Sequence, residues 1–384
     1  MTIPNDVTIT GAAGVNLEGT RPRVIGRNAR LPVHGQSISE PVVRLYTDVG
    51  VSGWGWSAAT QEDARRLVGR KLHEVFSPET GTWDDLLMFD FPLWDLAGQL
   101  LDMPVHAMLG DTGSSPVPVY DGGIYIDELD PDTARDDGIE PMLHAVNMGL
   151  DAGFQAFKVK VGRGYKWMEP EAGIRRDVDV IRAIRDLVGP SVKVLIDANN
   201  GYTPDEARRV MREAGDCDIY WFEEPFEESV EECVAFKEFM REGGWSTLLA
   251  DGETRSSAYD AGFEEIVRAG GIDVVQLDLR HYTLTRWLRY MAVIRETGVM
   301  AAPHNWGSHL SGFYIPQFAH GLNSFAMGET DHMRMIAVTA DGYDIANGKR
   351  SVPDTPGFGL DLDEDAFAIA QRAETAWTVG SPHP

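Results

Sequence analysis

Six polar residues recur along the second half of the chain at nearly constant spacing, and this spacing constrains the fold more than any other feature. Each lies at or just after the end of a short apolar run, and successive members are 26, 30, 25, 26 and 25 positions apart: Asp197, Glu223, Glu253, Asp278, His304 and Glu329. One strand with its returning helix takes about 30 residues in an α/β protein. Each step is therefore one βα unit, and each side chain has the same place in its unit.

This periodicity predicts an α/β fold of the (β/α) barrel type, with the six side chains at one mouth, where the strands end. Amphipathic helices are expected between eight strands near residues 117–120, 156–161, 192–196, 219–222, 247–250, 273–277, 299–302 and 324–327. A doubly wound sheet is the competing architecture. It would normally carry a phosphate-binding loop, but the sequence contains neither GxGxxG nor GxxxxGK followed by Ser or Thr.

The chain divides into three expected parts. Residues 1–115 predict an α+β domain, because VTITGAAGV and PVVRLYTDVGVSGWGWS alternate as strands do and two helical stretches follow them. The barrel is expected over residues 116–348. The acidic segment 349–384 is expected to fold back onto the N-terminal domain and to end in a short helix. Between the first two strands, residues 17–36 have the composition of a basic loop and are interpreted as a mobile flap.

Bulk composition excludes several classes of protein. The formal net charge is −26, so the chain offers no cationic surface to displace counterions from nucleic-acid phosphates. No apolar run approaches the roughly 20 residues that a membrane span needs, and the N-terminus lacks the pattern of a secretory leader. The two cysteines form no disulfide framework, which favours a reducing cytoplasm.

Three of the six residues predict a metal site. Asp197, Glu223 and Glu253 come from adjacent units, so three carboxylates would converge and repel one another. A hard divalent cation resolves this repulsion, and an all-oxygen site that is open to water and substrate suits Mg²⁺. The cofactor predicted from these residues is therefore Mg²⁺.

Candidate bases flank the predicted metal on both sides. Lys160 lies on one flank and His304 on the other, and Asp278 is placed to orient the imidazole and raise its basicity. Lys158, one pleat away, is expected to lower the pKa of Lys160 by like-charge repulsion. Two bases facing each other across a metal suit removal of a proton next to a carboxylate, with the metal taking up charge on the resulting enediolate.

The motifs KVK (158–160), DAN (197–199), EEP (223–225) and GE (252–253), with the lone Asp278 and His304, resemble the enolase superfamily, specifically its mandelate racemase subgroup. The resemblance spans nearly the whole chain. It implies a (β/α)7β TIM-like barrel under an α+β N-terminal capping domain that the C-terminal segment completes. The sister muconate cycloisomerase subgroup carries a second catalytic Lys on the sixth strand. Here that strand has the sequence VVQLDLRHY, without a Lys, which favours the mandelate racemase type.

The resemblance also implies roles for single residues. Asp197, Glu223 and Glu253 look like the Mg²⁺ ligands of the subgroup. Proton transfer is implied for Lys160 on one side and for the His304–Asp278 dyad on the other. Glu329 resembles the eighth-strand acid that hydrogen-bonds the substrate carboxylate, and Lys158 is implied to assist at that carboxylate.

The predicted function is Mg²⁺-dependent dehydration of an acid sugar, an aldonate or aldarate, to a 2-keto-3-deoxy acid. A racemase, epimerase or cycloisomerase acting on a hydroxy acid or lactone is the alternative, and a noncatalytic sugar-acid binding protein is a third hypothesis. The expected partner is a small-molecule carboxylate, and assembly as a homo-oligomer is expected. Polar and aromatic residues near the mouth suit a hydroxylated substrate, and the candidates for binding it are Asn199, Arg280, Trp306 and Tyr120.

The basic cap segment suggests one further contact. Four arginines within it could meet a second substrate carboxylate, as in an aldarate; they are Arg21, Arg23, Arg27 and Arg30. An ordinary solvated loop is the alternative interpretation of the same residues.

Overall fold

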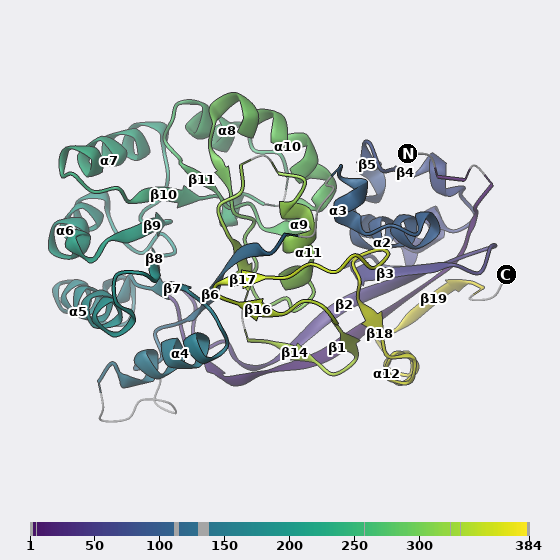
Figure 1. The fold of residues 1–384 in the computed structure, drawn as a ribbon, viewed down its shortest axis with the longest axis horizontal. Helices are drawn as coiled ribbons and strands as arrows, with labels where there is room; N and C mark the ends of the chain where they lie inside the picture. The colour runs from purple at the N-terminus through teal and green to yellow at the C-terminus, as the bar shows by residue number, and fades with distance from the viewer. Residues whose placement is uncertain are drawn as a thin grey trace.

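The computed structural model describes residues 3–4, 6–110, 115–129, 138–256, 258–322, 324–330 and 332–381. It is a mixed α/β fold with two main sheets, a largely parallel central sheet and an antiparallel sheet at the other end of the molecule (Figure 1). Among the described residues, no helix is both long and apolar enough to cross a bilayer.

Parallel strands of the central sheet follow one another in chain order, from β6 to β12. They are β6 Val117–Ile124, β7 Ala156–Lys160, β8 Lys193–Asp197, β9 Ile219–Glu223, β10 Leu248–Asp251, β11 Val274–Val275 and β12 Met300–Ala301. Helices connect them along the outer side (Figure 1): α4 Glu140–Asp151, α5 Pro170–Val188, α6 Pro204–Ala214, α7 Val230–Glu242, α8 Ala261–Arg268 and α10 Leu284–Thr297. The first seven predicted strands therefore lie within a few residues of their expected positions.

The eighth predicted strand has different bounds. β13 is Gly328–Thr330, and it pairs in parallel with β6, with Glu329 beside Tyr120. The expected residues 324–327 lie just before it. There the Ala301 amide donates to the Ser324 carbonyl, and the Ala326 amide donates to the Ala301 carbonyl. One extended segment thus bonds to β12 with its first half and to β6 with its second, which displaces the regular strand by four residues.

The N-terminal sheet corrects the prediction of a flap over residues 17–36. β1 Ile9–Ile25 and β2 Gly35–Thr47 form one long antiparallel hairpin, whose pairing continues to Ile25 opposite Gly35. Burial alternates along the first half of this segment, with Leu17 buried between the exposed Asn16 and Glu18. This period of two is typical of a strand, and the loop shrinks to residues 26–34.

Segments distant in sequence complete this sheet. β3 Ser52–Trp56 pairs with β2, and β14 Arg334–Met335 pairs with β1. Near the C-terminus, β19 Trp377–Gly380 pairs with the start of β1, with Val379 opposite Ala12. The last helix, α12 Glu364–Ala370, ends well before β19.

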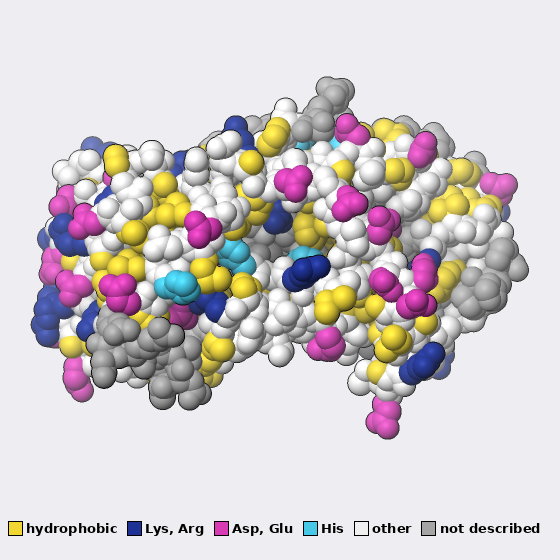
Figure 2. Space-filling model, turned by 60° about the horizontal axis from the view of Figure 1, so that its bottom comes forward, with side chains coloured by type: hydrophobic (Ala, Val, Ile, Leu, Met, Phe, Trp, Pro, Cys, Tyr) yellow, Lys and Arg dark blue, Asp and Glu magenta, His cyan; other side chains and the backbone are white. Residues whose placement is uncertain are grey.

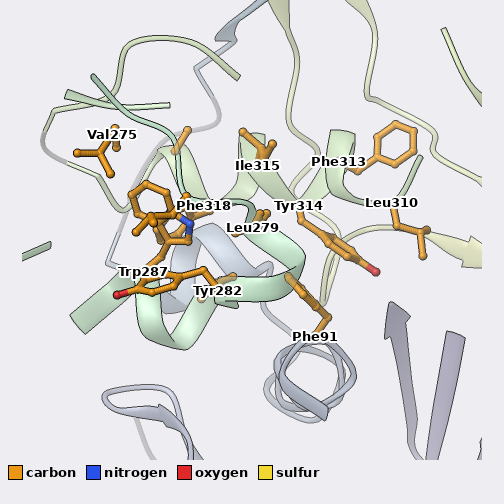
Figure 3. Packing of buried hydrophobic residues seen from close by; sticks show 14 of the residues in the cluster. Phe91, Val275, Leu279, Tyr282, Trp287, Leu310, Phe313, Tyr314, Ile315 and Phe318 are labelled. Carbon is orange, nitrogen blue, oxygen red and sulfur yellow. The ribbon is translucent and has the colours of Figure 1, made fainter. Parts of the chain in front are cut away.

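An aromatic contact joins the two ends of the molecule. Phe91 of α2 (Asp90–Leu101) stacks on Tyr314 of α11 (Ser311–Ala319), with ring centroids 4.6 Å apart (Figure 3). The Tyr314 hydroxyl also accepts a hydrogen bond from the Trp56 amide of β3 at 3.1 Å. Beside this pair, the buried Thr285 hydroxyl donates to Asp90 at 2.5 Å. These contacts fix the antiparallel sheet against the helices that surround the central one.

Candidate active site

Alternation along the strands directs the candidate side chains to the inner face of the central sheet. On β7, Phe157 and Val159 pack outward against helices, which leaves Lys158 and Lys160 on the inner face. Parallel register then brings strand ends together, because Lys160 pairs with Asp197 and Asp197 with Glu223. Farther along the sheet, Asp278 and His304 form an isolated parallel bridge.

The three predicted metal ligands converge as expected. One carboxylate oxygen from each of Asp197, Glu223 and Glu253 lies within 4.8 Å of the others. Asp197 and Glu223 are fully buried, so their charges cannot be screened by water. A compact, all-oxygen, buried donor set of this kind fits a hard divalent cation such as Mg²⁺.

The lysines form one side of the cluster, here named the lysine flank and consisting of Lys158, Lys160, Asp197 and Glu223. Lys160 Nζ contacts Asp197. Lys158 Nζ lies 2.6 Å from Glu223 Oε1 and 2.9 Å from Glu329 Oε1. Burial would lower the pKa of Lys160, but Asp197, together with Tyr125 and Glu253, outweighs burial and raises it. Repulsion from Lys158 lowers the pKa as predicted, but the net shift of the pKa is upward.

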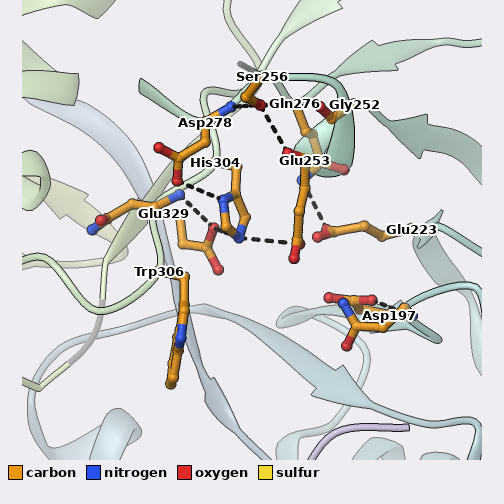
Figure 4. A network of polar contacts seen from close by, with 12 residues as sticks. Asp197, Glu223, Gly252, Glu253, Ser256, Gln276, Asp278, His304, Trp306 and Glu329 are labelled. Atoms are coloured by element: carbon orange, nitrogen blue, oxygen red, sulfur yellow. Dashed lines mark hydrogen bonds and ion pairs between the residues drawn. The ribbon is translucent and has the colours of Figure 1, made fainter. Parts of the chain in front are cut away.

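Opposite it lies the histidine flank, which consists of Glu253, Asp278, His304 and Glu329. His304 Nδ1 is 3.0 Å from Asp278 Oδ2, and Nε2 is 3.1 Å from Glu253 Oε2 (Figure 4). Burial would lower the pKa of His304, but the surrounding carboxylates, Glu253 first, raise it well above its usual range. The dyad expected from the sequence is therefore assembled, with Nε2 directed toward the carboxylate cluster.

Asp278 is held more firmly than the sequence suggested. Its Oδ1 accepts the His281 Nδ1 contact at 2.9 Å and the backbone amides of Arg280 and His281, as the N-cap of α9 (Leu279–Tyr282). The Asp278 backbone amide donates to the Ser256 hydroxyl oxygen at 2.6 Å. Burial would raise the pKa of Asp278, but Arg280, His281 and His304 outweigh it and hold the pKa well below its usual range. Asp278 therefore stays anionic beside His304.

Glu329 bridges the two flanks. Its Oε1 contacts Lys158, and its Oε2 accepts the Asn305 amide at 2.9 Å and lies 3.7 Å from His304 Nε2. Glu329 was predicted just beyond the eighth strand, and the structure places it as the middle residue of β13. One carboxylate thus touches groups from both flanks.

Beneath Glu223 lie two donors that the sequence analysis did not single out. Trp221 Nε1 donates to Glu223 Oε2 at 3.2 Å. Gln276 Nε2 donates to the same oxygen at 2.8 Å (Figure 4). Both side chains are fully buried. A signal was present in VVQLD, where Gln276 interrupts an apolar run two positions before Asp278 and therefore shares its face.

Aromatic residues line the side of the site next to the β1–β2 hairpin, here named the cap hairpin. The rings of Tyr125, Trp306 and His34 contact one another, with centroids between 4.7 and 5.2 Å apart. Lys160 Nζ lies 5.3 Å from the Tyr125 ring, and the Arg21 guanidinium lies 4.9 Å from the Trp306 ring. Trp306, a predicted substrate-binding residue, is thereby placed close to both flanks.

The other predicted substrate-binding residues have varied surroundings. Asn199 follows Asp197 in a left-handed conformation with φ of 45°, and its buried Oδ1 accepts no hydrogen bond from the described residues. Tyr120 is fully buried, with its ring 5.7 Å from Lys158 Nζ. Arg280 donates to the Trp306 carbonyl and lies 3.5 Å from Asp278. Asn199 and Trp306 therefore stay candidates for substrate binding, whereas the contacts of Tyr120 and Arg280 join them to other residues of the site.

Ion pairs hold two of the four cap arginines. Arg23 pairs with Asp127 at 2.7 Å, and Arg30 pairs with Glu227. Arg27 lies over the Trp167 ring at 4.5 Å. Arg21, on the Trp306 ring, is therefore the member of this group with a contact to the predicted substrate-binding residues.

A buried carboxylate connects the cap hairpin to the histidine flank. Glu40 of β2 is fully buried and accepts the Ser308 hydroxyl and the His309 amide, both at 2.6 Å. The Ser308 carbonyl in turn accepts the Asn305 side-chain amide at 3.0 Å. Because the Asn305 backbone bonds to Glu329, the cap reaches the site through a short hydrogen-bonded path. The single Glu within the polar segment SISEPV gave no signal of this role.

Comparison with known sequences gives one family match and several relatives. Residues 129–366 match the family described as "Enolase C-terminal domain-like". A D-galactarolactone cycloisomerase from Agrobacterium fabrum is 28% identical over 365 residues, covering 85% of this chain and 89% of that protein. An arabinonate dehydratase from Saccharolobus solfataricus is 28% identical over 281 residues, covering 72% and 69%.

Solved structures extend the similarity over the whole chain. A variant of galacturonate dehydratase from a Geobacillus species, in complex with Mg, has a TM-score of 0.92 at 29% identity and covers 99% of each chain. The same enzyme in complex with D-galacturonate and 5-keto-4-deoxy-D-galacturonate has a TM-score of 0.91 at 29% identity, covering 98% of this chain and 100% of that one.

Proposed function

Because the chain belongs to the enolase C-terminal domain-like family, we propose that it is a Mg²⁺-dependent dehydratase of acid sugars. One observation carries this proposal. Lys160 and His304 lie on opposite sides of a buried carboxylate cluster, on the lysine flank and the histidine flank. Two proton-transfer groups separated in this way suit a reaction in which a proton leaves one carbon and a hydroxyl leaves the next.

Asp197, Glu223 and Glu253 are the proposed Mg²⁺ ligands, on the support of their convergence and burial. When bound, the ion supplies Lewis-acid stabilisation for the charge that develops on the substrate carboxylate. Mg²⁺ is also the ion in the solved Geobacillus relative.

The chain's own residues have separate proposed tasks. One of Lys160 and His304 removes the proton from the carbon next to the carboxylate. The other donates a proton to the hydroxyl on the adjacent carbon, which leaves as water. Asp278 fixes the His304 tautomer by accepting from Nδ1, and this leaves Nε2 as the transferring atom. Lys158 and Glu329, in contact at 2.9 Å, are proposed to position the substrate carboxylate.

The substrate class is proposed to be a polyhydroxylated acid. Relatives named as dehydratases act on arabinonate and galacturonate, so the class includes a uronic acid beside the aldonates and aldarates predicted from sequence. Asn199 and Trp306 are the residues proposed to contact its hydroxyl groups, on the support of the unpaired Asn199 Oδ1 and of Trp306 beside Tyr125.

The test is a screen of aldonates, aldarates and hexuronates with purified protein and Mg²⁺, in which keto-acid formation is followed by a carbonyl reagent and by mass spectrometry. We expect at least one acid to give a product that is one water lighter than the substrate, and we expect a chelator to abolish the reaction. Failure of the whole panel, together with no solvent-deuterium uptake into any acid, would reject catalysis and favour the sugar-acid binding hypothesis.

Cycloisomerisation is the second candidate, because the Agrobacterium relative carries that name. The same machinery would then act on a lactone, and the product would keep the mass of the substrate. A racemase or epimerase would also conserve mass and would incorporate solvent deuterium, but it would form no keto acid. Product mass together with the carbonyl reagent therefore separates the three reactions.

Closure of the central sheet as a (β/α)7β TIM-like barrel is also proposed. Its support is that β13 pairs with β6 while the preceding Phe325 forms a bridge with Ala301 of β12. Division of the chain at residues 115 and 348, with residues 349–384 completing the cap, is proposed from the pairing of β19 with β1. Assembly as a homo-oligomer and a cytoplasmic location stay predictions.

A further inference from the structure

The Glu223 carboxylate has markedly different surroundings on its two oxygens. Oε2 accepts hydrogen bonds from Gln276 Nε2 at 2.8 Å and from Trp221 Nε1 at 3.2 Å. Oε1 faces Lys158 Nζ at 2.6 Å, and the same ammonium lies 3.4 Å from Asp197 Oδ2. Each carboxylate oxygen has two lone pairs, so two donors saturate Oε2.

The fold explains why both donors reach one oxygen. Trp221 lies two residues before Glu223 on the same strand, so both side chains share the inner face. Gln276 comes from the end of β11, two strands away, which is roughly 10 Å in a sheet. The intervening inner position on β10 is Ala250, whose small side chain leaves room for Gln276 to pass. The Gln276 amide nitrogen faces Glu223 because its oxygen would be repelled by the carboxylate.

We infer that Trp221 and Gln276 are positioning residues that select the ion at the carboxylate cluster. Because both donors bond to Oε2, Glu223 can bind a cation through Oε1 alone. Mg²⁺ is small, demands octahedral geometry and suits single carboxylate oxygens, whereas the larger Ca²⁺ gains from carboxylates that bind through both oxygens. The two donors therefore favour Mg²⁺ over Ca²⁺. This inference rests on the proposed metal site.

Calorimetric titration of the full chain with Mg²⁺ and with Ca²⁺ tests the inference. Gln276→Met keeps the length and approximate volume of the side chain but removes the donor, and Trp221→Phe removes the second donor. We expect the ratio of the Ca²⁺ to the Mg²⁺ affinity to rise about tenfold in Gln276→Met, the loss expected for one hydrogen bond to a charged group. A smaller rise in the same direction is expected for Trp221→Phe, whose bond is longer.

Gln317→Met is the matched control. Gln317 is also a fully buried glutamine, but its amide donates to the Tyr343 hydroxyl at 2.9 Å in α11, away from the carboxylates. Its substitution is expected to leave the affinity ratio unchanged. Circular dichroism establishes that each variant is folded before titration.

The possible outcomes separate this inference from the proposed function. If the parent protein binds neither ion, the metal site itself is wrong. If the parent binds Mg²⁺ but Gln276→Met and Trp221→Phe weaken both ions by the same factor, the two residues merely support Glu223 and ion selection is refuted. A changed ratio in both variants, with none in the control, supports selection by Oε2 saturation.

Discussion

The lysine flank and the histidine flank are built in different ways, although they face the same carboxylates. Strands β7, β8 and β9 each have five residues, and their ladder continues to the pairs Lys160–Asp197 and Asp197–Glu223. Strands β11 and β12 have two residues each, and Asp278 and His304 meet through an isolated bridge. Backbone hydrogen bonds there join His304 to Leu277 and Leu279. Side-chain acceptors add to them, because the Ser256 hydroxyl accepts from the Asp278 amide and the Glu329 carboxylate accepts from the Asn305 amide.

This difference indicates which parts of the site tolerate change. A group held by a backbone ladder keeps its position when one neighbouring side chain is altered, because the ladder does not depend on that side chain. A group held by side-chain hydrogen bonds loses its position when one partner is removed. The histidine flank should therefore respond to substitutions around it far more than the lysine flank does.

The largest expected effects come from the two transferring groups themselves. Lys160→Met and His304→Asn should each lower kcat/KM by about 10³-fold or more, because positioned acid–base groups contribute roughly 10²–10⁴-fold each. Steady-state kinetics on the substrate identified in the screen measures the loss. Mg²⁺ binding should persist and the circular dichroism spectrum should change little, since neither residue is a proposed ligand. The exposed Lys193→Met and His73→Asn are matched controls with unchanged rates expected.

The same pair of variants distinguishes the roles of the flanks. The variant that lacks the proton-abstracting base should lose solvent-deuterium uptake at the carbon next to the carboxylate. The variant that lacks the acid should keep this exchange while losing product. Near-normal turnover in both variants would show that neither group transfers a proton. The two flanks would then have no separate catalytic roles.

Loss of the Asp278 carboxylate should have the next largest effect. Asp278→Asn replaces the charged acceptor, 3.0 Å from His304 Nδ1, by a neutral amide that no longer fixes the His304 tautomer by charge, and we expect kcat/KM to fall by about 10²-fold. Asp121→Asn is the control, because Asp121 also lies 3.0 Å from a histidine, His332, but outside the two flanks. Equal losses in the two variants would contradict a special role for the dyad.

Much of the fold was predictable because regular spacing is a property of sequence itself. The interval from Asp197 to Glu223 and onward fixed the number of βα units, and the apolar runs located seven strands closely. The long β1–β2 hairpin was missed because its outer half is polar on one face, so residues 17–25 lack the apolar run that marks a strand. The bounds of β13 were missed because the residues just before it bond to β12, whereas β13 itself bonds to β6. Pairing with strands that are distant in the sequence leaves no local pattern.

The site was predictable to the extent that strand ends carry it. Asp197, Glu223 and His304 were identified because each follows an apolar run at the common interval, and Lys160 was identified from the run AFKVK. Gln276 and Glu40 were not, because their partners lie 53 and 268 positions away in the chain. Contacts across such distances depend on how strands and cap assemble, and no local pattern records them.

A smaller effect is expected from the tie between the cap and the histidine flank. Glu40→Gln leaves one oxygen for the Ser308 hydroxyl or the His309 amide but removes the charge that both donors share. We expect kcat/KM to fall about tenfold, as for loss of one buried hydrogen bond to a charged group. The exposed Glu18→Gln is the control, since Glu18 also accepts a serine hydroxyl, from Ser39 at 2.7 Å. If Glu40→Gln left kcat/KM unchanged, the hydrogen bonds from Ser308 and His309 to Glu40 would not be needed to position the loop after His304.

The smallest expected effect concerns stability and two histidines, one near each flank. His34 lies beside Lys160 and Tyr125, and His309 follows Ser308. Burial, followed by neighbouring cations, lowers the pKa of each to about 4. An unfolded histidine binds a proton near pH 6.5, so acidification through this value stabilises the unfolded state, and the free energy of unfolding falls as the pH drops toward 4.

His34→Gln and His309→Gln should each reduce this fall between pH 7 and 5 by about 1 kcal/mol, after allowance for partial exposure. Urea unfolding at both pH values measures it, with the exposed His73→Gln as control. If both variants keep the parental pH dependence, neither imidazole is held neutral in the folded protein. The surroundings assigned to His34 and His309 would then be wrong.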